Sequence, residues 1–362
     1  MKTAWRSWLV ASCVMSASAS LAQTPLSVGS TSHGTAVGND WGVTNTGTIA
    51  EVECDQYCEV QYTLPLKPGY ANGSAVVFLQ LYYLRWSQAG SGEVYHSRIM
   101  VEKNSYIPTT GDITVTASAD LQDDATPGRK FQWGVWFTVF AGDNTNAIAR
   151  TKTLSNFVQA GTGNPCDTTA PCEDSSTLTS VKTSSLTWHA ALVRGFDVGT
   201  ASGNGVKVNT LGFDSTSYSA GTINATGATT CSFESSTAED VLCEVGLATL
   251  SFATPTATHE FWKSSLSGSV SSVSGPNYTS DNGTYGGSKS VVKWLIGLQS
   301  TNQSTTSGGD ISLGRTSVGT GASSLNSGPP IFVNTQGTFD FATYTTNPTY
   351  NASYTSYLGF IY

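Results

Sequence analysis

The chain has 362 residues, a formal net charge of −8 and only 12% charged residues. A negatively charged surface repels phosphate backbones, so nucleic acid is not expected as a partner. Ser, Thr and Gly dominate where a helical protein would place Ala, Leu, Glu and Lys at a 3.6-residue spacing, and the sequence therefore predicts an all-β fold.

Residues 1–22 have the pattern of a secretory signal peptide. Lys2 and Arg6 supply a positive start, residues 8–15 an apolar stretch, and residues 20–22 a cleavage point of small residues. The apolar stretch is shorter than the ~20 residues that a membrane-spanning helix needs. We therefore expect cleavage, a net charge of about −10 in the mature chain, and a secreted protein that is soluble or attached to the cell surface by other means than a membrane-spanning helix.

Residues 23–160 are predicted to form a first β-sandwich domain. Residues 75–86 are an almost unbroken apolar and aromatic run, which is typical of a strand covered on both faces. Residues 113–119 indicate a second strand. Residues 131–141 alternate between two faces, one of them strongly apolar, and indicate a third.

The connection between the last two of these strands is rich in aspartate. It covers residues 120–128 and turns at Pro127-Gly128. Strand, Asp-rich corner and aromatic strand, over about residues 110–142, resemble the late-strand corner of immunoglobulin-like and fibronectin type III-like sandwiches of bacterial surface proteins. The resemblance implies an architecture and no activity.

Six cysteines follow the predicted leader, and they fall into three pairs whose members are close in the sequence. An even number in an exported chain indicates a disulfide framework, although the sequence leaves many connectivities open. We expect the local pairs Cys54–Cys58, Cys166–Cys172 and Cys231–Cys243. Zinc binding is the competing interpretation, but the chain has no Cys-x-x-Cys and no histidine beside a cysteine pair.

Residues 161–178 concentrate Gly, Pro and polar residues without apolar periodicity, and are predicted to be a linker. Residues 179–362 would then form a second β-rich domain, a sandwich or a jelly-roll-like fold. Its predicted strands cover residues 185–196, 206–213, 241–252, 259–273, 288–298 and 338–362.

The last of these segments alternates and ends on Tyr362. It resembles the terminal strand of outer-membrane barrels and, less closely, that of donor-complemented pilins. The last strand of a soluble sandwich is the third interpretation. The third is favoured because residues 358–362 are apolar on both faces and earlier segments lack the regular spans of about ten alternating residues that a barrel requires.

Two groups of acidic residues are candidate sites. Glu51, Glu53 and Asp55 alternate, so on a strand their carboxylates share one face. Such a face could hold calcium or act in glycoside hydrolysis, while a solvated acidic surface is the favoured interpretation. The loop residues Asp120, Asp123 and Asp124, with Asp143 further on, form a second calcium candidate, against which a polar turn surface is favoured.

Aromatic residues suggest a binding role. Tyr278, Tyr285, Tyr344 and Tyr350 lie in polar surroundings, where exposed rings could stack on sugars or pack at an interface. Tryptophans in predicted strands, Trp86, Trp133, Trp136, Trp188, Trp262 and Trp294, are expected in the core for the most part. No Gly-x-Ser-x-Gly is present, and the four histidines, His96 among them, are scattered along the chain.

The favoured function is that of a non-enzymatic binding or structural protein of the cell exterior: an adhesin, an appendage component or a carbohydrate-binding protein. Its partners would be a glycan, a protein surface or further copies of itself, and calcium is the one candidate cofactor. A secreted enzyme acting on polysaccharide is the second hypothesis and rests on the acidic strand. An outer-membrane or pore-forming protein is the third, from Ser/Thr-rich stretches such as residues 264–274.

Overall fold

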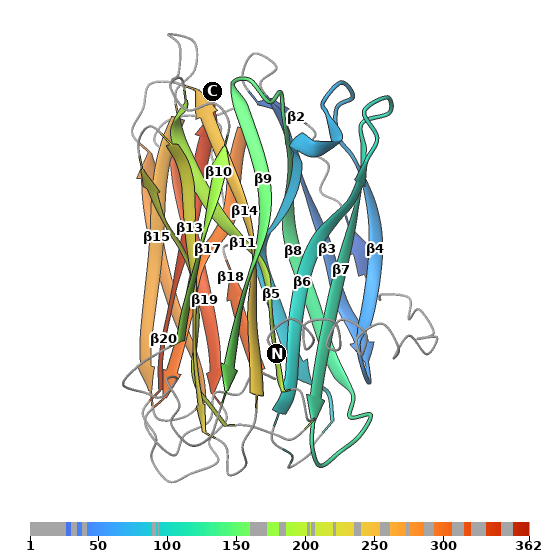
Figure 1. Cartoon of the computed structure of the whole chain (residues 1–362), viewed down its shortest axis with the longest axis vertical. Coiled ribbons are helices and arrows are strands. Elements are labelled where there is room, and N and C mark those ends of the chain that lie inside the picture. The colour runs from blue at the N-terminus through green and yellow to red at the C-terminus, as the bar shows by residue number, and fades with distance from the viewer. Residues whose placement is uncertain are drawn as a thin grey trace, which may run out of the picture.

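The protein is built almost entirely from antiparallel strands (Figure 1). The computed structural model describes residues 27–29, 35–37, 42–88, 92, 94–159, 172–180, 186–200, 203, 207–219, 222–234, 240–253, 261–272, 275–285, 293–305, 315–319, 331–341 and 350–361. Within these ranges the one helical element is a single 3-10 turn at Asn72–Ser74. The expected all-β fold is confirmed.

The strands are numbered in chain order. They are β1 (Ser27–Gly29), β2 (Thr35–Val37), β3 (Gly42–Cys54), β4 (Cys58–Pro65), β5 (Ala75–Trp86), β6 (Val94–Tyr106), β7 (Asp112–Asp123), β8 (Phe131–Gly142), β9 (Ala147–Gln159) and β10 (Cys172–Ser180). They continue as β11 (Leu186–Thr200), β12 (Lys207–Ser219), β13 (Thr222–Glu234), β14 (Asp240–Ala253), β15 (Phe261–Ser272), β16 (Gly275–Tyr285), β17 (Lys293–Thr305), β18 (Arg315–Gly319), β19 (Ile331–Phe341) and β20 (Tyr350–Ile361).

These strands form three sheets. The first sheet has the order β1-β3-β8-β5-β18-β19-β16, with β2 also paired to β3. The second has the order β4-β7-β6-β11-β14-β9, and the third β10-β13-β12-β17-β20-β15. The long strands run along the long axis of the molecule, with β3, β4, β6, β7 and β8 at one side and β13, β15, β17 and β20 at the other (Figure 1).

The larger core lies between the first and second sheets. Alternate residues of β8, from Phe131 and Trp133 to Ala141, are fully buried there, and they face the buried alternate residues Ile113 to Leu121 of β7. This burial confirms the apolar face that the alternation in residues 131–141 predicts, because every second side chain of a strand points to the same side.

A second core lies on the opposite face of β5. Val76 and Phe78 pack there with Phe140 and with Leu192, Leu250 and Phe252 of β11 and β14. The rings of Phe140 and Phe252 meet edge to face with their centroids 5.5 Å apart. A Cβ added to Gly297 of β17 would come within 3 Å of Leu192 and Phe78, so the third sheet packs closely against this core. β5 is thus covered on both faces, as its unbroken apolar run predicts.

The sheets do not divide at the predicted linker. β6 pairs with β11, β9 with β14, and β5 with β18, so two of the three sheets combine strands from both sides of residues 161–178. Residues 172–178, expected to be part of a linker, belong to β10 and pair with β13. The division into domains 23–160 and 179–362 stays a prediction against which these pairings weigh.

The Asp-rich corner carries the chain from β7 in the second sheet to β8 in the first. The immunoglobulin-like resemblance of this corner stays a prediction. At the end of the chain, β20 is hydrogen-bonded on both edges, by β15 and β17, and the three interpretations of the terminal strand stay predictions. Over the described ranges, no helix has the length and hydropathy needed to cross a membrane.

Candidate functional site

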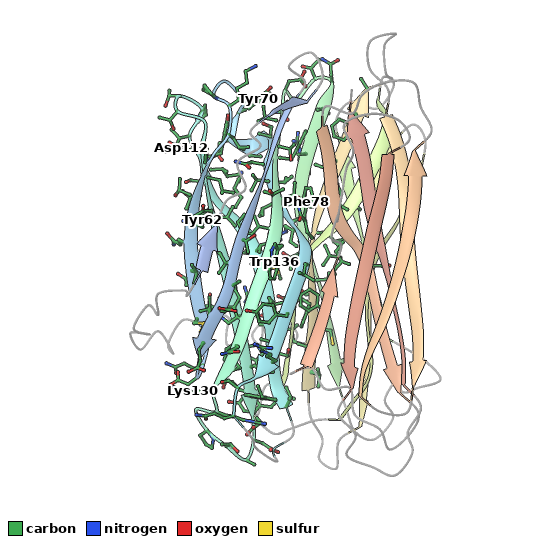
Figure 2. The ribbon with its side chains drawn as sticks, turned by 180° about the vertical axis from the view of Figure 1, so that it is seen from behind. Tyr62, Tyr70, Phe78, Asp112, Lys130 and Trp136 are labelled. Atoms are coloured by element: carbon green, nitrogen blue, oxygen red, sulfur yellow. A yellow bond between two sulfur atoms is a disulfide. The ribbon has the colours of Figure 1, made fainter. Side chains whose placement is uncertain are left out.

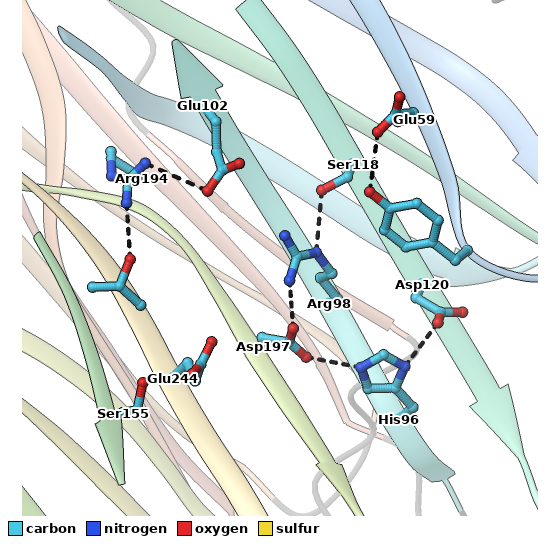
Figure 3. Close-up of polar contacts among 12 residues, drawn as sticks. Glu59, His96, Arg98, Glu102, Ser118, Asp120, Ser155, Arg194, Asp197 and Glu244 are labelled. Carbon is cyan, nitrogen blue, oxygen red and sulfur yellow. Dashed lines mark hydrogen bonds and ion pairs between the residues drawn. The ribbon is translucent and has the colours of Figure 1, made fainter. Parts of the chain in front are cut away.

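Four charged side chains meet on the outer face of the second sheet, the face turned away from the larger core (Figure 3). We call His96, Arg98, Asp120 and Asp197 the charged cluster. They come from β6, β7 and β11, and their register places them together, because Arg98 is directly opposite Asp120 on one side and Asp197 on the other. The odd-numbered residues of β7 fill the core, so Asp120 points outward.

The imidazole of His96 is held between two carboxylates. Its Nδ1 lies 2.7 Å from Oδ2 of Asp120, and its Nε2 lies 2.8 Å from Oδ1 of Asp197. Burial disfavours the charged imidazole, but the hydrogen bonds and charges of the two aspartates outweigh it and raise the pKa of His96 from 6.5 to about 10. At neutral pH both ring nitrogens therefore carry protons and donate.

Arg98 completes the pairing of Asp197. Its Nη1 donates to Oδ2 of Asp197 at 2.5 Å, and its Nε donates to the hydroxyl of Ser118 at 3.2 Å. Burial favours the neutral acid, yet His96 and Arg98 together lower the pKa of Asp197 below its ordinary value of 3.8. The carboxylate is thus ionised at all but strongly acidic pH.

Asp120 is the most enclosed member, with 2% of its surface exposed. Its Oδ2 also accepts a hydrogen bond from Nε2 of Gln122 at 2.7 Å, and the hydroxyl of Tyr95 donates in turn to Oε1 of Gln122. Its other oxygen, Oδ1, is buried without a partner among the described residues, as is the hydroxyl of Ser97. Asp120 is therefore held from one side only.

A glycine makes room for the histidine ring. Gly199 of β11 is directly opposite His96, and a Cβ added there would lie 2.6 Å from Cδ2 of His96. The imidazole can lie across β11 and reach Asp197 because position 199 has no side chain. Gly246 of β14 provides similar space, since an added Cβ would lie 2.7 Å from the sulfur of Met100.

Polar contacts continue from the charged cluster across the sheet. Arg194, 6% exposed, donates to the hydroxyl of Thr153 at 3.2 Å and approaches a carboxylate oxygen of Glu102 at 3.7 Å. Further along, Ser155 of β9 donates to Glu244 of β14 at 2.5 Å. Side chains from all five strands from β7 to β9 therefore contribute to one polar surface (Figure 3).

The chemistry of the charged cluster suits a structural role, in which the side chains link neighbouring strands. A general base needs a pKa close to the working pH and a free lone pair, whereas His96 is protonated at neutral pH and both its nitrogens are engaged. A metal would require the neutral imidazole. The arrangement joins β6, β7 and β11 by charge-assisted hydrogen bonds, which are the stronger class of hydrogen bond in proteins.

The predicted acidic strand lies elsewhere, on the outer face of the first sheet. Glu51 is exposed at a β-bulge, with φ at 57°, and its N–H donates to the hydroxyl of Tyr83. Glu53 forms an ion pair of 3.0 Å with Lys130, and Asp55 is exposed in the turn after β3. Only Glu51 and Glu53 belong to β3, because the strand ends at Cys54, and a shared face for all three carboxylates stays a prediction.

The predicted acidic loop is separated by the structure. Asp120 belongs to the charged cluster, whereas Asp123 pairs with Arg129 at 2.8 Å and accepts the N–H groups of residues 125 and 126. Asp124 is exposed. Asp143 accepts three backbone N–H groups of its own turn, those of residues 145 to 147. In the described part of the chain no three His, Cys, Asp or Glu residues gather in a way that could hold a metal, and the calcium sites stay predictions.

One predicted disulfide is confirmed. Cys54 and Cys58 are bonded, and Nε1 of Trp133 donates toward both sulfurs at 3.4 and 3.1 Å. Cys243 is also disulfide-bonded, to a partner whose side chain lies outside the described residues. Cys172 and Cys231 occupy directly opposite positions of β10 and β13. The pairs Cys166–Cys172 and Cys231–Cys243 stay predictions.

The predicted tyrosine contacts fall outside the described side chains. Tyr278 and Tyr285 belong to β16 and Tyr350 to β20, while Tyr344 lies outside the described residues altogether. Among the tryptophans whose side chains the structure describes, Trp133 is fully buried, whereas Trp136 lies half-buried on the outer face of the first sheet. The alternation explains this, since residues 133 and 135 face the core and 136 faces away.

Sequence reasoning missed Arg98 and Asp197 and treated His96 as one of four scattered histidines. None of the three lies in a strand that the sequence predicts, since residues 94–106 are not predicted as a strand and the predicted strand 185–196 ends one residue before Asp197. The pairing of β6 with β11 brings them together, and nothing local in the sequence specifies that pairing.

Comparisons with known proteins identify no family. No family model matches the chain, and no curated protein matches it. A solved structure described as the triple jelly roll fold and turret assembly in an archaeal virus is 10% identical, with a TM-score of 0.16, and the match covers 58% of this chain and 60% of that one. The major capsid protein P2 of bacteriophage PM2 is 8% identical, with a TM-score of 0.13, and the match covers 55% of this chain and 98% of that one. Likeness at this level supports no conclusion about function.

Proposed function

We propose that the chain is a non-enzymatic structural or binding protein of the cell exterior, in the class of adhesins, appendage components and carbohydrate-binding proteins. The observation that carries this proposal is that the side chains of the charged cluster bind one another. Its histidine and its arginine are committed to the aspartates of neighbouring strands, and His96 is held in the protonated state. These groups stabilise a sheet and are unsuited to proton transfer at neutral pH.

The Cys54–Cys58 disulfide supports an exterior location. Disulfides persist in oxidising compartments and are rare in the reducing cytosol. The bond closes the turn between β3 and β4 beside the buried Trp133, where it braces the corner between the first and second sheets. A secreted chain with the predicted leader would form this bond after export.

The competing enzyme hypothesis is tested by turnover. The purified full chain is incubated with a panel of polysaccharides, and release of reducing ends is measured for the wild type, Glu53→Gln and Asp197→Asn. We expect no release above the buffer control in any of the three proteins. Release by the wild type that Glu53→Gln or Asp197→Asn abolishes, with the melting temperature unchanged, would establish a carboxylate-dependent hydrolase and overturn the proposal.

A further inference from the structure

The outer face of the first sheet carries a surface of aromatic and charged side chains that neither core uses. It is formed where β3, β8 and β5 lie side by side, and Trp136 and Lys130 mark its middle and one end (Figure 2). Three cross-strand rows follow from the register. Arg85, Gln132 and Glu53 form the first row, Tyr83, Gly134 and the Glu51 bulge the second, and Leu81, Trp136 and Thr48 the third.

Tyr83 lies flat on the sheet. A Cβ added to Gly134, its neighbour on β8, would lie 2.5 Å from the Tyr83 ring, so the ring covers the glycine. The hydroxyl reaches beyond β8 and accepts the N–H of Glu51 on β3 at 2.5 Å. The Tyr83 side chain, which is half-buried, therefore packs one face of its ring against the backbone of β8. The hydrogen bond and the glycine fix it in that position.

Trp136 extends the same surface. It lies two residues after Gly134 on the same face of β8, is half-buried, and has its ring centroid 6.1 Å from that of Tyr83 with the planes inclined by 51°. Two aromatic rings at this spacing form a platform on which the C–H faces of successive pyranose rings can stack, since an aromatic face is both apolar and electron-rich. Rigid rings also lose little conformational freedom on binding.

Basic groups lie at one end of the platform. Arg85 is exposed, donates from Nε and Nη2 to Gln132 at 3.2 and 2.8 Å, and has its Cζ 5.6 Å from the centroid of Tyr83. Arg315 of β18 occupies the position directly opposite Arg85. Glu51, by contrast, lies at the β3 side, where it can accept hydroxyl groups.

We propose that this face binds a glycan chain that carries carboxylate groups, a polymer of uronic acid. Tyr83 and Trp136 stack on consecutive sugar rings, the guanidinium of Arg85 pairs with a sugar carboxylate, and Glu51 accepts hydroxyl groups on the far side. The planar donor fork of arginine matches the geometry of a carboxylate. This site deepens the binding role proposed above and rests on it.

Binding is tested by isothermal titration of the full chain with hexamers of galacturonic acid and of mannuronic acid, and with cellohexaose as the neutral probe. We expect one of the acidic hexamers to bind, and Trp136→Ala to weaken it at least tenfold. Arg85→Gln should weaken the acidic hexamer by a similar factor while leaving any binding of cellohexaose unchanged. The affinity for the acidic probe should fall as the salt concentration rises.

Tyr57→Ala is the matched control. Tyr57 is 42% exposed and has the guanidinium of Arg98 6.0 Å from its ring centroid, but it lies on the other side of the sandwich. Its loss should leave glycan binding unchanged. The inference is overturned if neither acidic hexamer binds, or if binding survives both Trp136→Ala and Arg85→Gln in folded protein. Neither result contradicts the structural role proposed above, because that role is tested separately by the release of reducing ends from polysaccharides.

Discussion

The imidazole of His96 on β6 and the carboxylate of Asp197 on β11 lie 2.8 Å apart, although 101 residues separate them in the chain. The hydrogen bond joins strands on either side of the segment that the sequence indicates as a linker. It is one of several contacts through which the early and late parts of the chain stabilise one another, and its charges make its contribution dependent on pH.

Substitution of His96 by glutamine should destabilise the protein by about 2 kcal/mol near pH 6, because it removes the cation between two aspartates and leaves charge-assisted hydrogen bonds unmade. Urea denaturation measures the change. Lys130→Gln is the control: it breaks an ion pair whose two side chains are 45% and 36% exposed, and should cost well under about 1 kcal/mol. Equal effects of the two substitutions would contradict a structural role for the charged cluster.

The penalty of His96→Gln should also change with pH. The pKa of His96 is raised in the folded state to about 10 from 6.5, so its stabilisation is complete below about pH 6.5 and is lost as the pH rises toward 10. The pKa of Asp197 is lowered from 3.8, so its contribution is present above about pH 4 and is lost at lower pH. Denaturation at pH 5.5, 8 and 10 should show the difference between wild type and variant shrinking at each step. A difference that is constant over this range would refute the assignment.

Gly199→Ala should perturb the charged cluster without changing any charge. The added methyl would meet the His96 ring at 2.6 Å, which forces the ring away from Asp197. We expect a loss of about 1–3 kcal/mol, and a pKa of His96, followed by NMR, that moves down toward 6.5. Gly73→Ala is the control, because nothing lies within 4 Å of a Cβ at that position. An unchanged histidine pKa in Gly199→Ala would show that the glycine is not needed for the contact.

Loss of the confirmed disulfide should be tolerated at a moderate cost. The double variant Cys54→Ala/Cys58→Ala frees only a short loop, for which the loss of chain entropy corresponds to about 2 kcal/mol. The thiol-free turn also removes the acceptors of the Trp133 N–H. Calorimetry should therefore show a lower melting temperature with the fold retained, while an unchanged melting temperature would mean that the bond does not brace the corner.

Unfolding should be a single event for the whole chain. Because β6–β11, β9–β14 and β5–β18 link the predicted domains, the two parts share sheets and cannot lose their hydrogen bonds independently. Calorimetry and far-ultraviolet circular dichroism should give one coincident transition. Two separated transitions, or stable fragments after proteolytic cleavage within residues 161–171, would instead support the division at the linker.

Individual strands were the most predictable feature. The apolar run at residues 75–86 corresponds in its bounds to β5, and residues 131–141 and 113–119 lie within β8 and β7. A strand with one buried face has apolar residues at every second position, and a strand between two cores has an unbroken run of apolar residues. These segments can therefore be predicted from their local sequence alone.

The pairing of strands was not predictable in the same way. The short segment at β10 lacks an apolar period, and its place beside β13 depends on residues about fifty positions later in the chain. The bulge at Glu51 and the outward turn of Trp136 are small local features, yet they decide which side chains share a surface. His96 and Asp197 become a pair only through a register that no local pattern specifies.

The shared sheets also constrain how the protein is made. A chain synthesised from its N-terminus completes β5 at Trp86, but the neighbouring strand β18 begins only at Arg315. Until then one edge of β5 offers bare N–H and C=O groups to any extended peptide nearby, and one edge of β6 does so until β11 is made. Truncation of the chain before residue 315 should therefore produce aggregates, because one edge of β5 stays unpaired.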